Sequence, residues 1–134
     1  MLTEKEKELF TIVVKKAESL SDCEKKQGAV IISEESPGTI FFGFNKPITK
    51  DHEQSAVVDV LLNVLSEKEL IMFVTYFPSI EDFKLIVAKR VAVLYLLGEV
   101  NNAGTVKFIN DLVALGSNLV LIKLEVGKNV YNQV

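Results

Sequence analysis

The segment from Val91 to Leu97 carries an apolar or aromatic side chain at every position, with almost no alternation between apolar and polar residues. A strand of this kind is buried on both faces, which is typical of a parallel sheet covered by helices on each side. Helical periodicity precedes the segment at 79–88 and follows it at 103–115. The run therefore predicts an α/β fold with three layers, α-β-α.

The remaining elements follow from periodicity and from turn residues. Thr3 and Glu6 have the spacing of a capping box, which predicts a helix over about 4–20. Two apolar runs separated by turn residues at 34–38 predict an antiparallel hairpin. The expected strands are 28–32, 39–44, 70–75, 91–97 and 119–126, and the further helices are 53–65, 79–88 and 103–115. We also expect a loop at 45–50, a polar tail over the last eight residues, and a single domain spanning 1–134.

The chain contains one cysteine, Cys23, and one histidine, His52. This count excludes a disulfide within the chain, and it excludes a zinc site built from three such side chains of one subunit. A net charge of -3 and a pI near 5.2 argue against binding of nucleic acid through phosphate neutralisation. The polar N-terminus and the lack of any apolar stretch of about 18 residues predict a cytoplasmic protein with no membrane contact.

Five short stretches of the sequence together resemble one known family. They are 27–31 (QGAVI), 43–45 (GFN), 73–78 (FVTYFP), 84–86 (KLI) and 91–95 (VAVLY). These stretches are similar to parts of the zinc-dependent cytidine and deoxycytidylate deaminases, and most closely to the deoxycytidylate branch. The resemblance implies a five-stranded mixed sheet in which a helix and an antiparallel hairpin come first and strands three to five run parallel.

The resemblance also shows where the chemistry of the family is altered. In the family, zinc held by one His or Cys and two Cys thiolates activates a water molecule, and a Glu beside the first ligand moves protons. The resemblance places the two Cys positions at Ser79 and Asp82. A serine hydroxyl stays protonated at neutral pH and is a poor substitute for a soft thiolate ligand. We therefore expect no zinc ion and no other cofactor.

The counterpart of the family's His-Ala-Glu motif lies shortly before Ala56, and two registers are open. In the first register, Asp51 replaces the metal ligand and Glu53 keeps the position of the proton shuttle. In the second register, His52 is the ligand and Gln54 replaces the shuttle. Neither register restores the site. We favour the first because it puts Ala56 on the family's buried alanine.

The altered positions have the spacing of helix caps. Ser79 precedes Asp82 by three residues, and Asp51 precedes Gln54 by the same distance. We therefore expect these residues to cap the two helices whose N-termini face the metal in the family. The alternative is that Asp51, Glu53 and Asp82 converge as oxygen ligands for magnesium or calcium.

These patterns predict a catalytically inactive protein of the deaminase fold, a pseudoenzyme that acts by binding a protein partner or a nucleotide. The candidate nucleotide contacts are Asn45, His52 and Thr75, and Asn45 resembles the nucleotide-contacting asparagine of the family. Because family members commonly assemble into oligomers, the resemblance implies a homo-oligomer, or a hetero-oligomer with an active relative. The alternative is an active nucleotide deaminase or hydrolase whose atypical site uses oxygen ligands or is completed across an interface.

Overall fold

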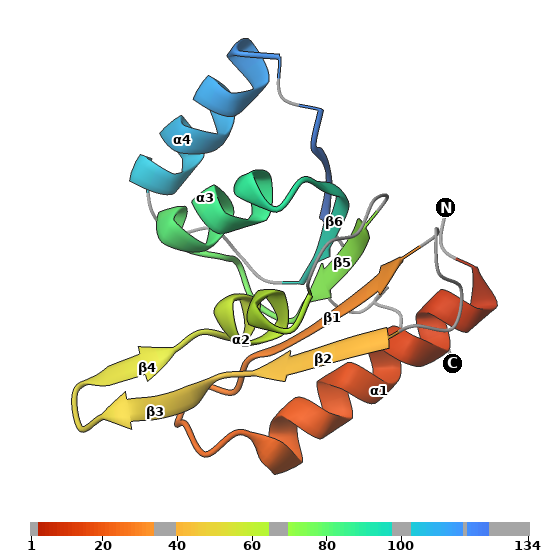
Figure 1. Cartoon of the computed structure of the whole chain (residues 1–134), viewed down its shortest axis with the longest axis vertical. Helices are drawn as coiled ribbons and strands as arrows, with labels where there is room; N and C mark the ends of the chain where they lie inside the picture. The colour runs from red at the N-terminus through yellow and green to blue at the C-terminus, as the bar shows by residue number, and fades with distance from the viewer. Residues whose placement is uncertain (1–2, 34–39, 65–69, 98–102, 117, 124–134) are drawn as a thin grey trace.

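A five-stranded mixed sheet forms the centre of the molecule (Figure 1). The computed structural model describes residues 3–33, 40–64, 70–97, 103–116 and 118–123. The strands of the sheet, in spatial order, are β2 (Ile40–Phe44), β1 (Gly28–Ser33), β5 (Leu70–Val74), β6 (Val91–Leu96) and β7 (Val120–Lys123). β1 runs antiparallel to β2 and β5, whereas β5, β6 and β7 run parallel. The predicted mixed sheet is confirmed.

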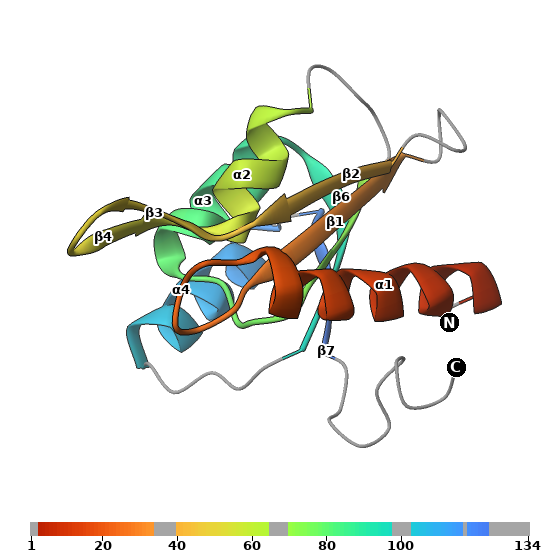
Figure 2. The ribbon, with the colours of Figure 1, turned by 90° about the horizontal axis from the view of Figure 1, so that it is seen from below.

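Helices cover both faces of this sheet. They are α1 (Glu4–Leu20), α2 (Ala56–Leu62), α3 (Ile80–Ala88) and α4 (Ala103–Ala114). α1 lies on one face, and α2 and α3 lie on the other (Figure 2). Side chains of a strand alternate between its faces, so Val30 and Phe73 pack in the cluster beneath α1 while Ile31 and Met72 pack in the cluster beneath α2 and α3. The predicted three layers are therefore present.

The first helix begins where the capping box predicts. The Thr3 hydroxyl accepts a hydrogen bond from the Glu6 N–H at 3.1 Å, and the Thr3 N–H donates to the Glu6 carboxylate at 2.9 Å. Further along α1, the ring of Phe10 stacks on that of Phe73 with centroids 4.1 Å apart. This stack fixes α1 against the central strand β5. In the described part of the chain, no helix is long and apolar enough to cross a membrane.

The segment between β2 and α2 differs from the prediction. Instead of a loop at 45–50 and a helix from 53, it forms an antiparallel hairpin of β3 (Lys46–Thr49) and β4 (His52–Gln54), which extends away from the sheet (Figure 1). α2 begins at Ala56, because the apolar periodicity starts there and Ser55 supplies the N-cap. The backbone groups of the preceding residues are instead paired between β3 and β4.

α2 packs directly on β2 at Gly43. A Cβ atom at this position would lie 2.5 Å from the backbone nitrogen of Val60 and 2.7 Å from the carbonyl oxygen of Ala56. Only a glycine therefore allows this approach of helix and strand. The predicted turn at 34–38, the end of the predicted last strand and the predicted polar tail lie outside the described residues.

Candidate functional site

The N-termini of α2 and α3 are each capped by a serine. The Ser55 hydroxyl accepts from the Val58 N–H at 3.2 Å, and the Ser79 hydroxyl accepts from the Asp82 N–H at 3.2 Å. The predicted cap at Ser79 is confirmed. The predicted cap at Asp51 is wrong, because Asp51 lies in the turn of the β3–β4 hairpin, several residues before the helix begins.

The carboxylate of Asp82 joins the two helix N-termini. The Ser55 hydroxyl donates to Oδ1 of Asp82 at 2.8 Å, and the Tyr76 hydroxyl donates to Oδ2 at 2.8 Å. The Tyr76 oxygen in turn accepts from the Val57 N–H at 3.2 Å. Asp82 is only 4% exposed. We call Ser55, Tyr76, Ser79 and Asp82 the Asp82 cluster.

Burial and a neighbouring negative charge both raise the pKa of Tyr76 in this cluster. Burial raises the pKa of Tyr76 above its usual value, and the negative charge of Asp82 and the hydrogen bond to it raise this pKa further. The phenol therefore stays protonated and acts as a hydrogen-bond donor at neutral pH. The carboxylate lies in the first turn of α3, where the helix dipole favours a negative charge.

Asn45 forms the centre of a second polar group, beside the Asp82 cluster. Its Oδ1 accepts from the Gln27 N–H at 2.9 Å and from the Ser21 hydroxyl, and its Nδ2 donates to the Lys25 carbonyl at 2.6 Å and to Glu53 Oε1 at 3.2 Å. A side-chain amide has two N–H donors and two acceptor lone pairs. The buried amide of Asn45 is therefore saturated, and it fastens the loop after α1 to the end of β2.

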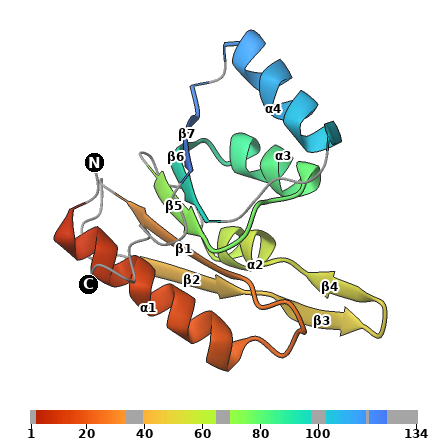
Figure 3. The ribbon, with the colours of Figure 1, turned by 180° about the vertical axis from the view of Figure 1, so that it is seen from behind.

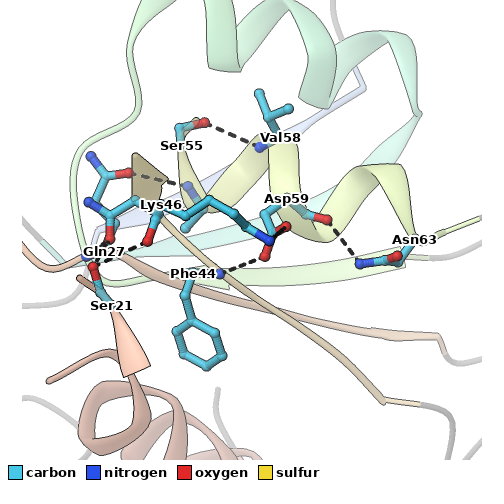
Figure 4. A network of polar contacts seen from close by, with 10 residues as sticks. Ser21, Gln27, Phe44, Lys46, Ser55, Val58, Asp59 and Asn63 are labelled. Carbon is cyan, nitrogen blue, oxygen red and sulfur yellow. Dashed lines mark hydrogen bonds and ion pairs between the residues drawn. The ribbon is translucent and has the colours of Figure 1, made fainter. Parts of the chain in front are cut away.

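The two polar groups are connected through Gln27. Its backbone N–H donates to Asn45, and its side-chain oxygen accepts from the Ala56 N–H at 3.2 Å, at the start of α2 (Figure 4). In the first turn of α2, the Asp59 carboxylate accepts from the Phe44 N–H at 3.0 Å and pairs with the Lys46 ammonium at 2.8 Å. These contacts hold α2 to β2 and to the base of the β3–β4 hairpin.

The side chains of the other predicted site residues have different partners from the Asp82 cluster. His52 lies on the exposed hairpin, with Nδ1 3.0 Å from the Thr49 hydroxyl. The Thr75 hydroxyl accepts from the Gly28 N–H at 2.9 Å, which extends the pairing of β1 and β5. Glu53 lies near Cys23, whose pKa is raised by burial and by the Glu53 carboxylate. Such a thiol is a poor nucleophile at neutral pH.

The sequence patterns did not single out Ser55, Tyr76, Gln27 or Asp59. Ser55 had a local signal, since it immediately precedes the apolar periodicity of α2, as an N-cap residue does. The roles of Tyr76 and Gln27 had no such signal. Tyr76 bonds to Val57, 19 residues away, and Gln27 bonds to Asn45 and Ala56, 18 and 29 residues away. The contact of Tyr76 with Asp82, six residues on, matches no capping spacing.

The residues at the two helix N-termini do not fit a zinc ion. The hydroxyls of Ser55 and Ser79 are used as caps, and both oxygens of Asp82 accept hydrogen bonds within the protein. Zinc prefers thiolate and imidazole ligands. Among the residues that the structure describes, no group of three or more His, Cys, Asp or Glu could hold a metal ion. The three carboxylates considered as oxygen ligands do not form one site. Asp51 lies in an exposed turn, Glu53 accepts from Asn45, and Asp82 accepts from Ser55 and Tyr76.

Comparison with known proteins shows the class of fold. No protein-family model matches the sequence, and no curated protein matches it. Among solved structures, the chain is similar to dCMP deaminase from the cyanophage S-TIM5. The apo form gives a TM-score of 0.67 at 20% identity, over 92% of this chain and 100% of that one. The complex of that enzyme with dCMP and dUMP gives a TM-score of 0.70 at 17% identity, over 92% of this chain and 99% of that one.

A second similarity is to larger proteins. RibD from Acinetobacter baumannii gives a TM-score of 0.63 at 13% identity, and this chain spans 36% of it. A diaminohydroxyphosphoribosylaminopyrimidine deaminase/5-amino-6-(5-phosphoribosylamino)uracil reductase from Thermotoga maritima gives 0.61 at 15% identity, with 38% of that chain covered. The protein therefore has the fold of these dCMP deaminase and RibD structures, as the sequence motifs predict.

Proposed function

We propose that this chain is a non-catalytic protein of the deaminase fold that acts by binding another protein chain. The observation that carries the proposal is the Asp82 cluster. The family resemblance places the metal ligands at the N-termini of the two helices that here are α2 and α3. In this chain the side chains at those N-termini bond to one another and to the backbone.

This geometry supports a register that differs from both sequence registers. Ser55 takes the first ligand position, because it lies at the start of α2 and its hydroxyl contacts Asp82 at 2.8 Å. The proton-shuttling Glu of the family comes two residues after the first ligand, which assigns its position to Val57. Val57 is fully buried and carries no group that transfers a proton. In this register, the chain lacks both the zinc ligands and the proton shuttle of the family.

A protein partner is favoured over a nucleotide. The asparagine that resembles the nucleotide-contacting residue of the family has all four of its hydrogen-bonding sites occupied within the chain. A nucleotide would have to break these buried bonds, and each would leave an unsatisfied group at a cost of about 1–3 kcal/mol. The proposed partner is a second copy of this chain or a related chain with an active site.

The register is tested by restoring zinc ligands. We expect the triple variant Ser55→His, Ser79→Cys, Asp82→Cys to bind one Co²⁺ or Zn²⁺ ion per chain, with thiolate-to-cobalt absorption bands as the readout. The matched control is Asp51→His, Ser79→Cys, Asp82→Cys, which should not give a three-ligand site. Circular dichroism verifies that both variants are folded. Metal binding by the control alone would contradict the assignment of Ser55.

Catalytic inactivity is tested on the wild-type chain. We expect purified protein to contain no stoichiometric zinc and to leave dCMP unchanged in an assay for dUMP. Zinc at one ion per chain, or conversion of dCMP that is lost in Glu53→Ala, would contradict the proposal and would support an atypical active enzyme.

A further inference from the structure

A cavity lies toward the opposite end of α3 from the Asp82 cluster. Its volume is about 620 Å³, and it is lined chiefly by Val87, Arg90, Val91, Leu112, Leu115 and Leu119. These residues belong to the C-terminal ends of α3 and α4 and to the segments that lead into β6 and β7, which lie together in Figure 3. At 1.5 Å per residue, Asp82 in the first turn of α3 and Val87 in its last turn lie about 7.5 Å apart along the helix axis. The volume is within the usual range of small-molecule sites.

The walls of this cavity are mostly apolar, with one polar side chain, Asn118, and one cation, Arg90. Among its lining residues, Arg90 alone carries a charge, and no acidic side chain lines the cavity. Arg90 is also the single arginine of the sequence. Within the described part of the chain, the ion pairs are all made by lysines, so the exposed guanidinium of Arg90 has no carboxylate partner there.

The backbone of Arg90 adopts a conformation that arginine rarely takes. Its φ is +60°, and it alone among the described non-glycine residues has a positive φ. Its N–H donates to the Val87 carbonyl at 3.0 Å and closes the end of α3. Glycine or asparagine is the favoured residue at such a helix end. An arginine held in this conformation at the edge of a cavity indicates a need for its side chain.

We propose that this cavity binds a small molecule with an apolar body and one anionic group, and that Arg90 pairs with the anion. The apolar walls supply the hydrophobic contact, and the guanidinium matches a carboxylate in two parallel hydrogen bonds. A cationic ligand would be repelled by Arg90, and a neutral ligand would leave its charge unused. The site is independent of the proposed function.

Medium-chain amphiphiles test the chemistry of the ligand on the full chain. Isothermal titration calorimetry would compare decanoate, octanoate and decyltrimethylammonium below their micelle concentrations. We expect decanoate to bind at least tenfold more tightly than the cation. It should also bind roughly tenfold more tightly than octanoate, because decanoate buries two more methylene groups away from water. Equal affinity for the anion and the cation, or no binding of decanoate, would overturn the proposal.

Substitutions test the role of Arg90. Arg90→Asn removes the charge and suits the positive φ, so the variant should fold while its affinity for decanoate falls at least fivefold; Arg90→Lys should keep most of the affinity. The matched control is Lys84→Gln, which removes a cation on the outer surface of the same helix that pairs with Glu81. The proposal is contradicted if Arg90→Asn binds like the wild type, or if the control weakens binding equally.

A substitution at the rim tests the location of the site separately. Leu115 lines the cavity and is 85% exposed, so Leu115→Asp should leave the fold intact. The new carboxylate should compete for Arg90 and reduce the affinity for decanoate at least fivefold. Unchanged affinity in this variant would place any decanoate binding elsewhere on the molecule.

Discussion

Asp82 shows how a single side chain can join two helix ends. A buried carboxylate is costly unless hydrogen-bond donors surround it, and here the Ser55 and Tyr76 hydroxyls supply them. In return, the carboxylate fixes Tyr76, whose oxygen accepts from the Val57 N–H at the start of α2. Removal of Asp82 would therefore take the acceptor from both hydroxyls, and removal of either hydroxyl would take a donor from one carboxylate oxygen.

At neutral pH, we expect Tyr76→Phe to lower the free energy of unfolding by about 1.5–3 kcal/mol, the usual effect of losing a hydrogen bond to a charged group. Urea denaturation measures this change. Tyr95→Phe is the comparison, because Tyr95 is also buried, and the contacts described for it are apolar or aromatic. If the two substitutions had the same effect, the bond from Tyr76 to Asp82 would not contribute to stability.

The raised pKa of Tyr76 also predicts a dependence on alkaline pH. An unfolded tyrosine ionises near pH 10, whereas the pKa of Tyr76 in the folded chain is higher. Its stabilising contribution is therefore complete below about pH 10 and is lost as the pH rises further. We expect the difference in stability between wild type and Tyr76→Phe to shrink above pH 10. A constant difference up to pH 11 would contradict this linkage, since Cys23 and Tyr95 are present in both proteins.

At the scale of the elements, the β3–β4 hairpin and the start of α2 separate residues that the sequence suggested would act together. Asp51 and His52 lie on the hairpin, Glu53 contacts Asn45, and Ser55 caps the helix. A helix N-terminus has unpaired N–H groups that need acceptors. Ser55 and Gln27 provide acceptors for α2.

We expect Ser55→Ala to lower the stability by about 1–2 kcal/mol, because it removes an N-cap and a donor to Asp82. Asp51→Ala should change the stability by less than about 0.5 kcal/mol, since Asp51 is exposed in a hairpin turn. Thermal and urea unfolding of the two variants compare these effects directly. A larger loss in Asp51→Ala than in Ser55→Ala would restore Asp51 as the cap of α2.

The contact between β2 and α2 makes a separate prediction. Gly43→Ala places a methyl group against backbone atoms of α2, so we expect a loss of at least about 2 kcal/mol from overpacking. Gly116→Ala is the control: its φ is +76° but a Cβ there meets open space, so only the backbone cost of about 1 kcal/mol applies. Equal losses in the two variants would show that α2 can move away from β2.

For the whole molecule, the fold and the site carry different information. The sheet and its helices have the fold of the dCMP deaminase structures, but a fold is compatible with many functions. The proposed function requires association with a second chain, and the saturated Asn45 disfavours a nucleotide. Two properties of the whole molecule therefore need to be measured: whether copies of the chain associate, and whether the chain binds a nucleotide.

We expect light scattering to give a molar mass at least twice the 14.9 kDa of one chain. Under the same conditions, dCMP and dUMP should leave the melting temperature unchanged. A ligand that binds only the folded state must raise this temperature, so an unchanged value indicates that neither nucleotide binds. A monomeric mass together with a rise in melting temperature on addition of dCMP would favour a nucleotide-binding protein over a partner-binding one.

Periodicity in the sequence was sufficient for the layered fold. The apolar run at 91–97 and the capping box at Thr3 act through neighbouring residues, so helices and strands follow from local pattern. The family motifs added the topology of the sheet. The hairpin at 46–54 was missed because its short strands are almost wholly exposed and have no apolar alternation.

The sequence by itself determined the layers, the cap at Ser79 and the shortage of zinc-binding side chains. Only the tertiary structure decided that Ser55 contacts Asp82, 27 residues away, and that the buried Asn45 has no hydrogen-bonding site left for a ligand. The physical reason is range: burial of an apolar face is encoded in the spacing of nearby residues, whereas a hydrogen bond between distant side chains depends on how whole elements pack.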